Sequence, residues 1–334
     1  MRKYEDLTHR GQFQRLGRLA RTALLAYPIG PDFRLTPLRH IENTTFRVDD
    51  LATGRRYCLR VHRPGYQSIA AIRSEMQFLE SLSRETDITV PRPVPTRHGD
   101  LLTTASTPGV DGERNVVLFE WVYGRFFRRG EARGMTERSG ATLARLQDFA
   151  ATFTPPPEFT RPRFDSDGFL GKTLERSFAD AGELVPAGDR EIIQRGYARA
   201  VDIREGIGRT PAVYGLIHAD FHRGNFLVAP GGQIAVIDFD DFGWGHFLYD
   251  VAVATINYAT NPARVGLCQD FLRGYRSVRA FSVGEEEMIP AFNLLRSVFM
   301  LQWFISRTDN PRLREWLPRH LAETVKQAKA LLRE

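Results

Sequence analysis

Polar side chains that could hold a metal ion and act on a bound molecule lie close together in the middle of the chain. The stretch IHADFHRGNFLVAPGGQIAVIDFD spans residues 217–240 and contains Asp220, Asn225 and Asp238. An amide oxygen and a carboxylate suit Mg²⁺, which usually keeps waters and substrate phosphates as the rest of its shell. A second carboxylate nearby would be placed to act on a molecule bound beside that metal. The residue types therefore indicate metal-assisted chemistry.

A tight hairpin would bring two of these side chains together. The apolar runs 226–228 and 234–237 are short and bounded by turn residues, which is typical of strands, and Pro230-Gly231-Gly232 lies between them. A two-residue turn at the Gly-Gly pair would give these opposed pairs: Ala229 with Ile234, Leu227 with Val236, and Asn225 with Asp238. Directly opposed side chains are about 4.5–5.5 Å apart at Cβ. A bulge would shift this register.

The order of these motifs resembles a known superfamily. His-x-Asp-x4-Asn, then a hairpin, then Asp-Phe-Asp is similar to the catalytic and metal-binding loops of protein-kinase-like enzymes. More narrowly, IHADFHRGNFLV and VIDFDDFGWGHFLYDVAVA look like the aminoglycoside phosphotransferase and choline kinase branch. The resemblance implies that Asp220 is the catalytic base, that Asn225 and Asp238 hold Mg²⁺, and that Asp250 supports the loop. The alternative is that these residues only form turns.

The sequence leaves two possible roles open for each of two further side chains of this stretch. Asp240 extends the acidic edge, and it either contacts a second metal or caps the next turn. His218 either scaffolds the loop, which we favour, or takes part in catalysis. Asp250 at the start of a helix also has the simpler interpretation of a capping residue.

An arginine and a glutamate in the N-terminal part are predicted to form a buried pair. Arg60 lies in the strand pattern 56–61, and Glu75 borders the apolar stripe of a helix that Ser68 can cap. A carboxylate there is costly without a partner, and Arg60 is the obvious one. The resemblance makes this pair the counterpart of the kinase Lys–Glu pair that fixes the nucleotide. His62 and Arg63 are further candidates for the phosphate contact, and a purely structural ion pair is the alternative.

Two short segments are assigned to nucleotide binding by the resemblance. The loop that would cover the phosphates contains Asn43, Thr44 and Thr45, whose hydroxyl and backbone N–H groups can contact phosphate oxygens. It lacks the glycines of a protein-kinase phosphate loop. The segment 120–124 matches the interlobe linker, where backbone groups of Glu120 and Val122 would hold adenine.

The pattern of elements predicts an α+β protein with a bilobal, protein-kinase-like fold. Strand patterns occur at 33–35, 44–48, 56–61 and 115–122, and a helix with period 3.6 is expected over 13–27. Helical patterns dominate after residue 136, including 136–149, 172–178, 189–207, 262–276, 284–307 and 311–332. We place the boundary near Tyr123. Residues 1–122 would form a nucleotide-binding lobe with an antiparallel sheet, and residues 123–334 a mostly helical catalytic and substrate-binding lobe.

Composition limits the classes of function. The 334 residues are 42% apolar and 26% charged, as in a soluble globular protein. We find no membrane span of about 20 apolar residues and no signal peptide, so we expect a cytoplasmic protein without a membrane partner. Cys58 and Cys268 predict neither disulfides nor a metal cluster. The net charge of +6 is scattered along the chain, which favours solvated surface over nucleic-acid binding.

The leading hypothesis is transfer of the γ-phosphoryl group of ATP to a small-molecule hydroxyl, with Mg²⁺ as cofactor. A Ser/Thr protein kinase of the same superfamily and a catalytically weakened nucleotide-binding protein are the alternatives. No recognisable activation segment follows Asp238, which favours small acceptors over proteins. Homoserine, choline-like alcohols, sugars and macrolides remain open as acceptors, whereas the positive net charge disfavours polycationic aminoglycosides.

Overall fold

The computed structural model describes residues 3–127, 132–165, 173–259, 265–308 and 310–333, and the chain forms two compact units. The first unit comprises Met1–Arg125, Thr154–Thr160 and Ala229–Asp240. The second comprises Phe126–Phe153, Arg161–Val228 and Asp241–Glu334. Neither unit is continuous in sequence, because the segment that carries Asp238 and Asp240 belongs to the first unit.

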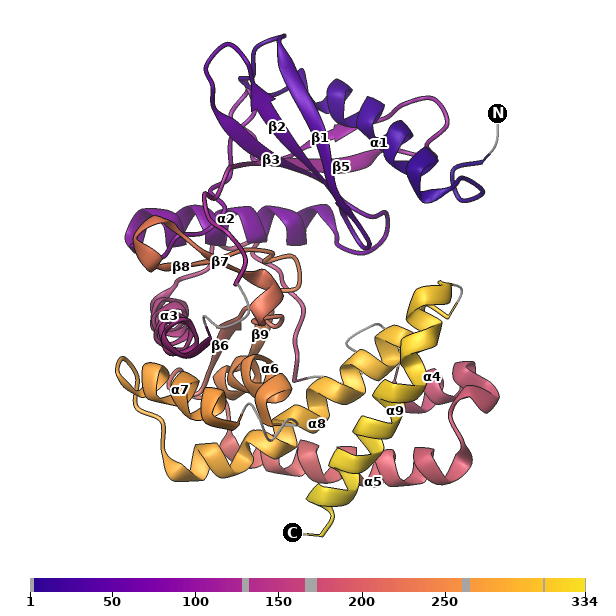
Figure 1. Cartoon of the computed structure of the whole chain (residues 1–334), viewed down its shortest axis with the longest axis vertical. Helices are drawn as coiled ribbons and strands as arrows, with labels where there is room; N and C mark the ends of the chain where they lie inside the picture. The colour runs from indigo at the N-terminus through magenta and orange to yellow at the C-terminus, as the bar shows by residue number, and fades with distance from the viewer. Residues whose placement is uncertain (1–2, 128–131, 166–172, 260–264, 309, 334) are drawn as a thin grey trace. The chain divides into compact units, whose positions relative to one another are not determined.

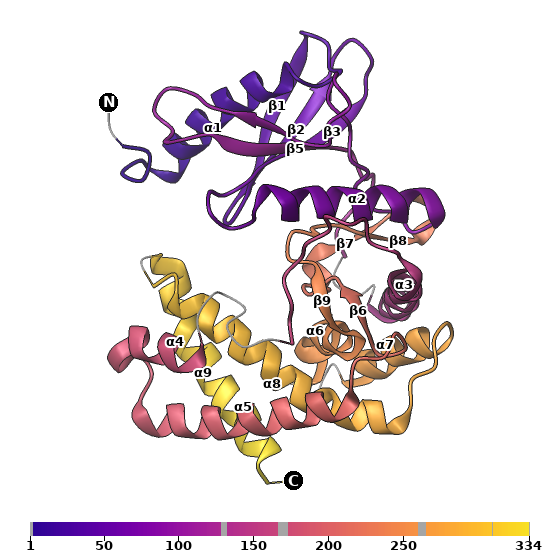
Figure 2. The same cartoon turned by 180° about the vertical axis from the view of Figure 1, so that it is seen from behind.

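The first unit is built on a five-stranded antiparallel sheet in the order β1-β2-β3-β5-β4. Its elements are α1 (His9–Leu24), β1 (Phe33–His40), β2 (Thr44–Asp50), β3 (Arg56–Val61), α2 (Ile69–Glu85), β4 (Thr103–Ala105), β5 (Arg114–Glu120) and β8 (Ile234–Val236). Figures 1 and 2 show α1 lying against this sheet. The sequence predicted α1 and the longer strands but not β4, which has only three residues.

The core of the first unit lies between α1 and the sheet. One face of β2 is buried at alternate residues, as the strand period of two requires. Phe46 and Val48 from this face join Leu16, Leu19 and Ala20 of α1 in one apolar cluster. The same alternation fixes the register of β3, where Arg60 lies opposite Thr45 of β2 and Val117 of β5.

Helix α2 follows the predicted pattern with one exception. The side chain of Ser68 accepts a hydrogen bond from the N–H of Ala71 and caps the helix. Ile72, Met76, Leu79 and Leu82 are buried as predicted. Ile69, which was also assigned to the apolar stripe, is 44% exposed. It is the first residue of the helix and lies beyond the end of the buried surface.

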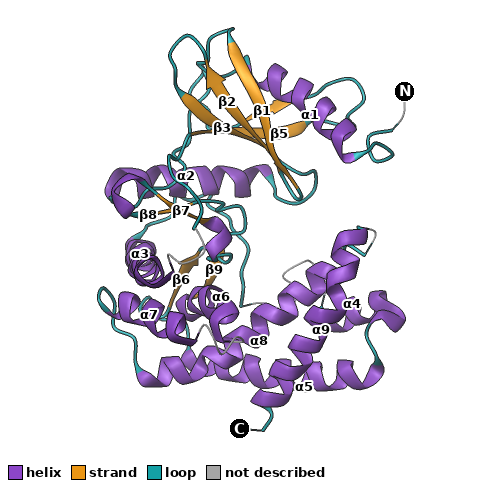
Figure 3. Cartoon of the chain, in the orientation of Figure 1, coloured by secondary structure: helices purple, strands orange, loops and turns teal. Residues whose placement is uncertain are grey.

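The second unit is mostly helical, as predicted, and Figure 3 shows its short strands among the helices. Its elements are α3 (Ala132–Thr152), α4 (Leu174–Ala181), α5 (Ala187–Ile207), β6 (Tyr214–Ile217), β7 (Phe226–Val228), β9 (Gly243–His246), α6 (Phe247–Ala259), α7 (Val265–Arg276), α8 (Val283–Ile305) and α9 (Pro311–Leu331). Strands β6 and β9 pair antiparallel and were not predicted. The predicted helix starts at Lys172 and Pro262 lie outside the described residues.

Helix α8 is the central helix of the second unit. It packs against α5, α6 and α9, and a capping box between Ser282 and Glu285 begins it. Among the described residues, one helix, α8, is long and apolar enough to cross a membrane. However, 78% of its most apolar 18-residue segment is buried inside the protein. A helix buried to this extent packs as a core helix of the second unit.

Helices α3 and α7 are in backbone contact at two glycines. A Cβ atom at Gly140 would lie 2.0 Å from the carbonyl oxygen of Phe271, and one at Gly274 would lie 1.8 Å from that of Glu137. Helix backbones cannot move apart without disturbing the packing on both sides. Only glycine therefore fits at these two positions.

We expect Gly274→Ala to lower the free energy of unfolding by about 1–3 kcal/mol, because the added methyl group overlaps a carbonyl of α3. Gly134→Ala in α3 is the matched control, since a Cβ there meets nothing within 4 Å. This control should be neutral or raise stability by about 0.5–1 kcal/mol. Urea unfolding of the two variants measures the difference, and equal effects would contradict the close approach.

Candidate active site

The loop that follows β6 carries Asp220 and is held by a buried carboxylate. Asp250, in the first turn of α6, is fully buried. Its two oxygens accept hydrogen bonds from the backbone N–H groups of His218 and Ala219, both at 2.7 Å. These bonds hold Ala219 in the left-handed region with φ 65°, which is costly for a residue other than glycine. Asp250 thus supports the loop rather than capping its own helix.

His218 has the geometry of a scaffolding residue. Its ring is buried, and its Nδ1 accepts a hydrogen bond from the backbone N–H of Asp220 at 3.3 Å. The ring also contacts Phe221 edge to face, with centroids 5.7 Å apart. The scaffolding interpretation that we favoured is consistent with these contacts.

Arg296 of α8 pairs with Asp220. One nitrogen of the guanidinium donates to Oδ1 of Asp220 at 2.5 Å, and another donates to the carbonyl oxygen of Ala219 at 3.2 Å. His222 lies 3.3 Å from the other carboxylate oxygen. The side chain of Asp220 is 21% exposed, so its carboxylate remains accessible although it is anchored on both sides.

The electrostatics of this site keep Asp220 ionised. Burial alone would raise the pKa of its carboxyl, but Arg296, and after it His222 and His218, hold the pKa well below its usual range. A carboxylate with a low pKa is a weak base. It is therefore suited to orienting a hydroxyl and to accepting its proton late, when the oxygen has already lost electron density.

Asn225 is fixed to the same carboxylate. It ends a short 3₁₀ turn, Arg223–Asn225, and is 1% exposed. Its amide nitrogen donates to Oδ2 and to the backbone oxygen of Asp220, at 2.9 and 3.0 Å. Because the nitrogen is used in this way, the amide oxygen of Asn225 points away from Asp220.

The turn between β7 and β8 differs from the predicted two-residue turn. The backbone N–H of Ala229 donates to the carbonyl oxygen of Gln233 at 2.9 Å, so Ala229 closes the turn with Gln233 rather than with Ile234. The turn contains Pro230–Gly232, and both of its glycines have positive φ. The first of these three residues, Pro230, has a fixed φ and no backbone N–H. The predicted opposition of Asn225 and Asp238, which depended on the shorter turn, is therefore not supported.

In the first unit, Arg60 and Glu75 form the predicted buried pair. A guanidinium nitrogen lies 2.6 Å from a carboxylate oxygen, and the two side chains are 5% and 1% exposed. The guanidinium also lies over the ring of Phe119, 5.0 Å from its centroid. Burial alone would lower the pKa of Arg60, but Glu75 and then Asp240 raise it above its usual value. The arginine is therefore always charged.

Asp240 connects this pair to the loop at residues 42–45. Its carboxylate is 3.9 Å from Arg60 and 3.7 Å from His62, and it accepts a hydrogen bond of 2.8 Å from the amide of Asn43. The amide oxygen of Asn43 accepts from the backbone N–H of Arg63 at 3.0 Å. Asn43 is thus held at both ends, and Arg63 itself pairs with Glu42 at 2.5 Å. Holding Asn43 beside Arg60 and His62 is thus a third possible role for Asp240, besides the metal contact and the turn cap considered from the sequence.

Thr44 and Thr45 begin β2 and differ in exposure. Thr44 is 3% exposed, and its hydroxyl contacts Nδ1 of His40 at 2.6 Å. The other ring nitrogen of His40 contacts Gln12 of α1 at 2.9 Å. Thr45 is partly exposed and lies opposite Arg60. The end of β1 is thus tied to α1 through His40.

We expect the stability of the first unit to depend on His40 at acidic pH. Burial, and after it His9, lower the pKa of His40 to about 4 from 6.5. Between these values the unfolded chain binds more protons, so stability falls as pH decreases from about 7 to about 4. After allowance for solvent screening, we expect a loss of about 1 kcal/mol. Urea unfolding of His40→Gln should show a smaller loss, whereas His98→Gln, an exposed control, should behave as the parent protein.

The backbone N–H groups of the linker residues differ in whether they are already hydrogen-bonded. Glu120 ends β5, and its N–H donates to the carbonyl of Arg92 at 2.8 Å, while the N–H of Trp121 donates to that of Arg56 at 3.1 Å. The N–H of Val122 makes no hydrogen bond to another described residue. This N–H is thus available to a ligand, and the adenine contact stays a prediction.

Asp238 belongs to the first unit, whereas Asn225 belongs to the second. Asp238 has φ 68°, and with Ala219 it is one of two residues other than glycine with positive φ in the described ranges. Its side chain is 41% exposed and lies 3.9 Å from an exposed nitrogen of Arg39. Backbone strain of this kind occurs at functional sites, and here it falls on the two predicted motif loops.

Arg296 is the residue that the sequence interpretation missed. It stands alone within the apolar run FNLLRSVFML of α8. A charge in such a run is costly unless it is paired, which is the same reasoning that assigned Glu75 to Arg60. The pattern indicated a partner for Arg296 but could not identify Asp220, which is 76 residues away.

The chain is similar to known phosphotransferases and kinases. Residues 34–286 match the model of the phosphotransferase enzyme family. The structure of a microcompartment-associated aminopropanol kinase is 31% identical, with a TM-score of 0.83 over 95% of this chain and 98% of that chain. An amicoumacin kinase, hAmiN, shares the fold at 22% identity, with a TM-score of 0.75 and 96% of each chain covered.

A curated relative carries the name of a protein kinase. "Serine/threonine protein kinase RdoA" of Salmonella typhimurium is 27% identical over 290 residues, which cover 86% of this chain and 82% of the relative. The α+β, protein-kinase-like fold class predicted from the sequence is confirmed by the aminopropanol kinase structure. Since the family model covers most of the chain, the protein belongs to the phosphotransferase enzyme family and is a kinase.

Proposed function

We propose that the enzyme transfers the γ-phosphoryl group of ATP to a hydroxyl group of a small molecule, from a cytoplasmic location. The observation that carries this proposal is the ionised carboxylate of Asp220. It lies on a loop that Asp250 supports, with Arg296 on one oxygen and Asn225 on the other. The printed names of the relatives, aminopropanol kinase and amicoumacin kinase, refer to small molecules.

Asp220 is the proposed catalytic base. It would accept a hydrogen bond from the acceptor hydroxyl and take its proton as the bond to phosphorus forms. Arg296 is a positioning residue, because it acts through Asp220 and keeps the carboxylate in one orientation. Alignment and charge stabilisation account for most of the catalysis of phosphoryl transfer, and a fixed carboxylate contributes to alignment.

Asn225 and Asp238 are the proposed Mg²⁺ ligands, and their donor atoms fit this ion. Both offer hard oxygen donors, and the hydrogen bonds between Asn225 and Asp220 use the amide nitrogen of Asn225 and not its oxygen. In the described ranges no three His, Cys, Asp or Glu side chains form a metal cluster. The rest of the ion's shell would be waters and nucleotide phosphates, whose charge it would neutralise.

The remaining roles concern ATP. Residues 1–122 are the proposed nucleotide-binding lobe and residues 123–334 the catalytic and substrate-binding lobe. Arg60 would contact the phosphates while Glu75 holds it in place, and the backbone at Asn43, Thr44 and Thr45 would lie over the phosphates. Backbone groups of Glu120 and Val122 would hold adenine. Asn43 would act mainly by positioning, since its amide is bound to Asp240 and Arg63.

A protein kinase is the second candidate, because a relative carries that name. Strand β9 begins at Gly243 and α6 at Phe247, so few residues separate Asp238 from the next helix. A protein kinase needs a longer activation segment there to bind its substrate and to regulate it. The short connection supports a small acceptor.

The test is a phosphorylation screen with ATP and Mg²⁺ over amino alcohols, homoserine, sugars, macrolides, aminoglycosides and a mixture of Ser/Thr peptides. We expect ADP release that depends on one class of small acceptor, with a phosphorylated product seen by ³¹P NMR. Phosphorylation of peptides alone would favour the protein kinase. ATP binding without ADP release for any acceptor would favour a catalytically weakened protein.

A further inference from the structure

The ring of His222 lies against the side chain of Asp220, which precedes it by two residues. Its Nε2 atom is 3.3 Å from Oδ2 of Asp220. The backbone makes a tight turn here, because the N–H of His222 donates to the carbonyl oxygen of Asp220 and the N–H of Asn225 donates to that of His222, both at 2.8 Å. The turn therefore holds the imidazole beside the carboxylate.

A second contact fixes which ring nitrogen of His222 carries a hydrogen. Nδ1 accepts a hydrogen bond from the backbone N–H of Gly224 at 2.9 Å, so His222 caps the short turn Arg223–Asn225. A ring nitrogen that accepts a hydrogen bond carries no hydrogen, which places the ring hydrogen on Nε2. The imidazole therefore presents an N–H group to Oδ2 of Asp220.

Gly224 allows the ring of His222 to lie this close to the backbone. A Cβ atom at Gly224 would lie 2.6 Å from Cε1 and 2.9 Å from Nδ1 of His222, and the next nearest atom, Nε2 of the same ring, would be 3.9 Å away. Gly224 does not have a positive φ, so its backbone conformation is open to other residues. The ring of His222 is thus what requires glycine at this position.

Three side chains among the described residues donate N–H groups to the carboxylate of Asp220. Oδ2 faces Asn225 at 2.9 Å and His222 at 3.3 Å, whereas Oδ1 faces Arg296 at 2.5 Å. A carboxylate oxygen has about two lone-pair sites for hydrogen bonds. Oδ2 is therefore saturated, and Oδ1 can accept one further hydrogen bond.

We propose that His222 is a positioning residue, which with Asn225 saturates Oδ2 and so makes Oδ1 the atom of Asp220 that accepts the proton of the acceptor hydroxyl. Without the imidazole, Oδ2 would have a lone pair open to the hydroxyl, and the acceptor could bind in a second, unproductive orientation. Phosphoryl transfer depends on alignment of the attacking oxygen, so this second orientation would lower kcat. The inference rests on the proposed phosphotransfer, but the ring tautomer that it requires can be measured without turnover.

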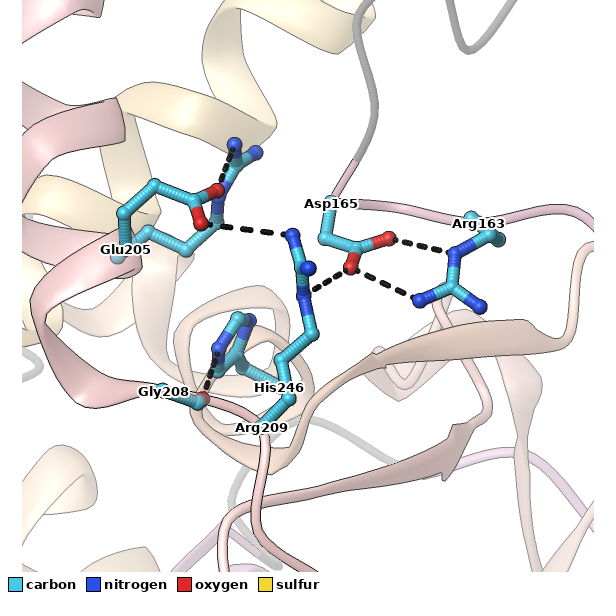
Figure 4. Close-up of polar contacts among 7 residues, drawn as sticks. Arg163, Asp165, Glu205, Gly208, Arg209 and His246 are labelled. Atoms are coloured by element: carbon cyan, nitrogen blue, oxygen red, sulfur yellow. Dashed lines mark hydrogen bonds and ion pairs between the residues drawn. The ribbon is translucent and has the colours of Figure 1, made fainter.

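His246 is the structural comparison for His222 in the same unit. Its ring is buried, and its Nε2 lies 2.9 Å from the carbonyl oxygen of Gly208, as Figure 4 shows together with a cluster of ion pairs. His246 is opposite Tyr214, at the end of β6 that is farther from the loop of Asp220. His246→Gln should therefore lower stability and leave kcat unchanged.

The first test is a cycle of variants at His222 and Gly224, assayed on the full chain with ATP, Mg²⁺ and the acceptor identified in the phosphorylation screen. His222→Ala should lower kcat about 10-fold, with the KM for ATP changed by less than about 2-fold. Gly224→Ala should lower kcat by a similar factor, because the methyl group displaces the ring. In the double variant, Gly224→Ala should add no further loss, since the ring that it would displace is absent.

Further variants separate positioning from capping. His222→Asn keeps a side-chain oxygen that can cap the turn, but its shorter amide does not reach Oδ2, so kcat should be as low as in His222→Ala. His222→Gln has an amide N–H long enough to donate to Oδ2, and kcat should recover to within about 3-fold of the parent protein. Gly206→Ala in α5, where a Cβ meets nothing within 4 Å, should leave kcat unchanged. Thermal unfolding checks that each variant is folded.

The second test is NMR spectroscopy of the full chain labelled with ¹⁵N-histidine, in which the spectrum of His222→Ala assigns the ring. We expect a hydrogen on Nε2 of His222 and none on Nδ1. This measurement needs neither nucleotide nor acceptor.

The outcomes separate this inference from the proposed function. Parent-like kcat in His222→Asn, equal losses from Gly224→Ala with and without the imidazole, or a hydrogen on Nδ1 would each overturn the proposal and leave His222 as a cap of its turn. In the first two cases the parent protein still turns over, so the phosphotransfer stands. If the parent protein phosphorylates no acceptor, the phosphotransfer fails and the catalytic role of Oδ1 fails with it, while the tautomer still shows whether His222 donates to Asp220.

Discussion

Asp220→Asn should lower kcat by about 10³-fold while the affinity for ATP changes by less than about 2-fold. The amide keeps the shape of the side chain but cannot accept the proton of the acceptor hydroxyl. Its amide oxygen can still accept the hydrogen bond from Arg296, which lies 2.5 Å from Oδ1 in the parent protein. The change therefore acts on the reacting hydroxyl and leaves the nucleotide contacts in place.

Asparagine is the better replacement because alanine would leave a buried guanidinium unpaired. Arg296 is 8% exposed, and breaking a buried pair by removing one partner costs about 3–5 kcal/mol. A loss of activity in the alanine variant would therefore mix catalysis with unfolding. Single-turnover kinetics and nucleotide titration, with thermal unfolding as the check, measure the effect in Asp220→Asn.

A surface carboxylate on the same unit provides the control. Asp148 pairs with Arg279 at 2.5 Å and its side chain is 48% exposed, so Asp148→Asn should leave kcat unchanged. Turnover by Asp220→Asn within a few-fold of the parent protein would refute the assignment of Asp220 as the base.

Glu75→Ala should lower the free energy of unfolding by about 3–5 kcal/mol. The substitution leaves Arg60 in a site where its side chain is 5% exposed, and Asp240 at 3.9 Å is too far to replace the lost hydrogen bond. Replacing both partners, in Arg60→Met/Glu75→Met, should cost much less, since apolar side chains of similar size have no buried charge to satisfy.

The double variant separates stability from nucleotide binding. If Arg60 contacts phosphates, the double variant should be folded and yet show a KM for ATP raised by about 10-fold or more. Glu85→Ala, which removes an exposed pair of 2.7 Å with Arg84, is the control and should change stability by less than about 1 kcal/mol. An unchanged KM in the folded double variant would mean that the pair is only structural.

Sequence periodicity predicted the elements that bury one regular face. Alternation gave β2 and β3, Ser68 predicted the capped start of α2, and the apolar stripe of α2 placed Glu75 at the border of its buried face. Strands β4, β6 and β9 were missed; each has three or four residues, and two of the four in β9 are glycines. Such strands are set by contacts with neighbouring segments and not by their own pattern.

The site was predictable where one motif contained both partners. His218 through Asn225 form one loop, and the contacts of Asp220 with His218 and Asn225 lie within it. The register of the turn could not be obtained from Gly231 and Gly232 alone, because Pro230 also enters it. The partners of Asp220 and Asp240, Arg296 and Asn43, are distant in sequence, and burial of a lone charge indicates only that a partner exists.

The pairing of Asp220 with Arg296 bears on how the reaction should respond to acidity. A base that stays charged throughout the physiological range contributes no acid limb to a rate profile. Any loss of rate below neutrality would then come from other groups: from Asp250, since burial raises its pKa to about 7, or from the terminal phosphate of the nucleotide, since phosphate esters take up a proton near pH 6. An acid limb that stays in place when one acceptor is exchanged for another would point to the loop that Asp250 supports.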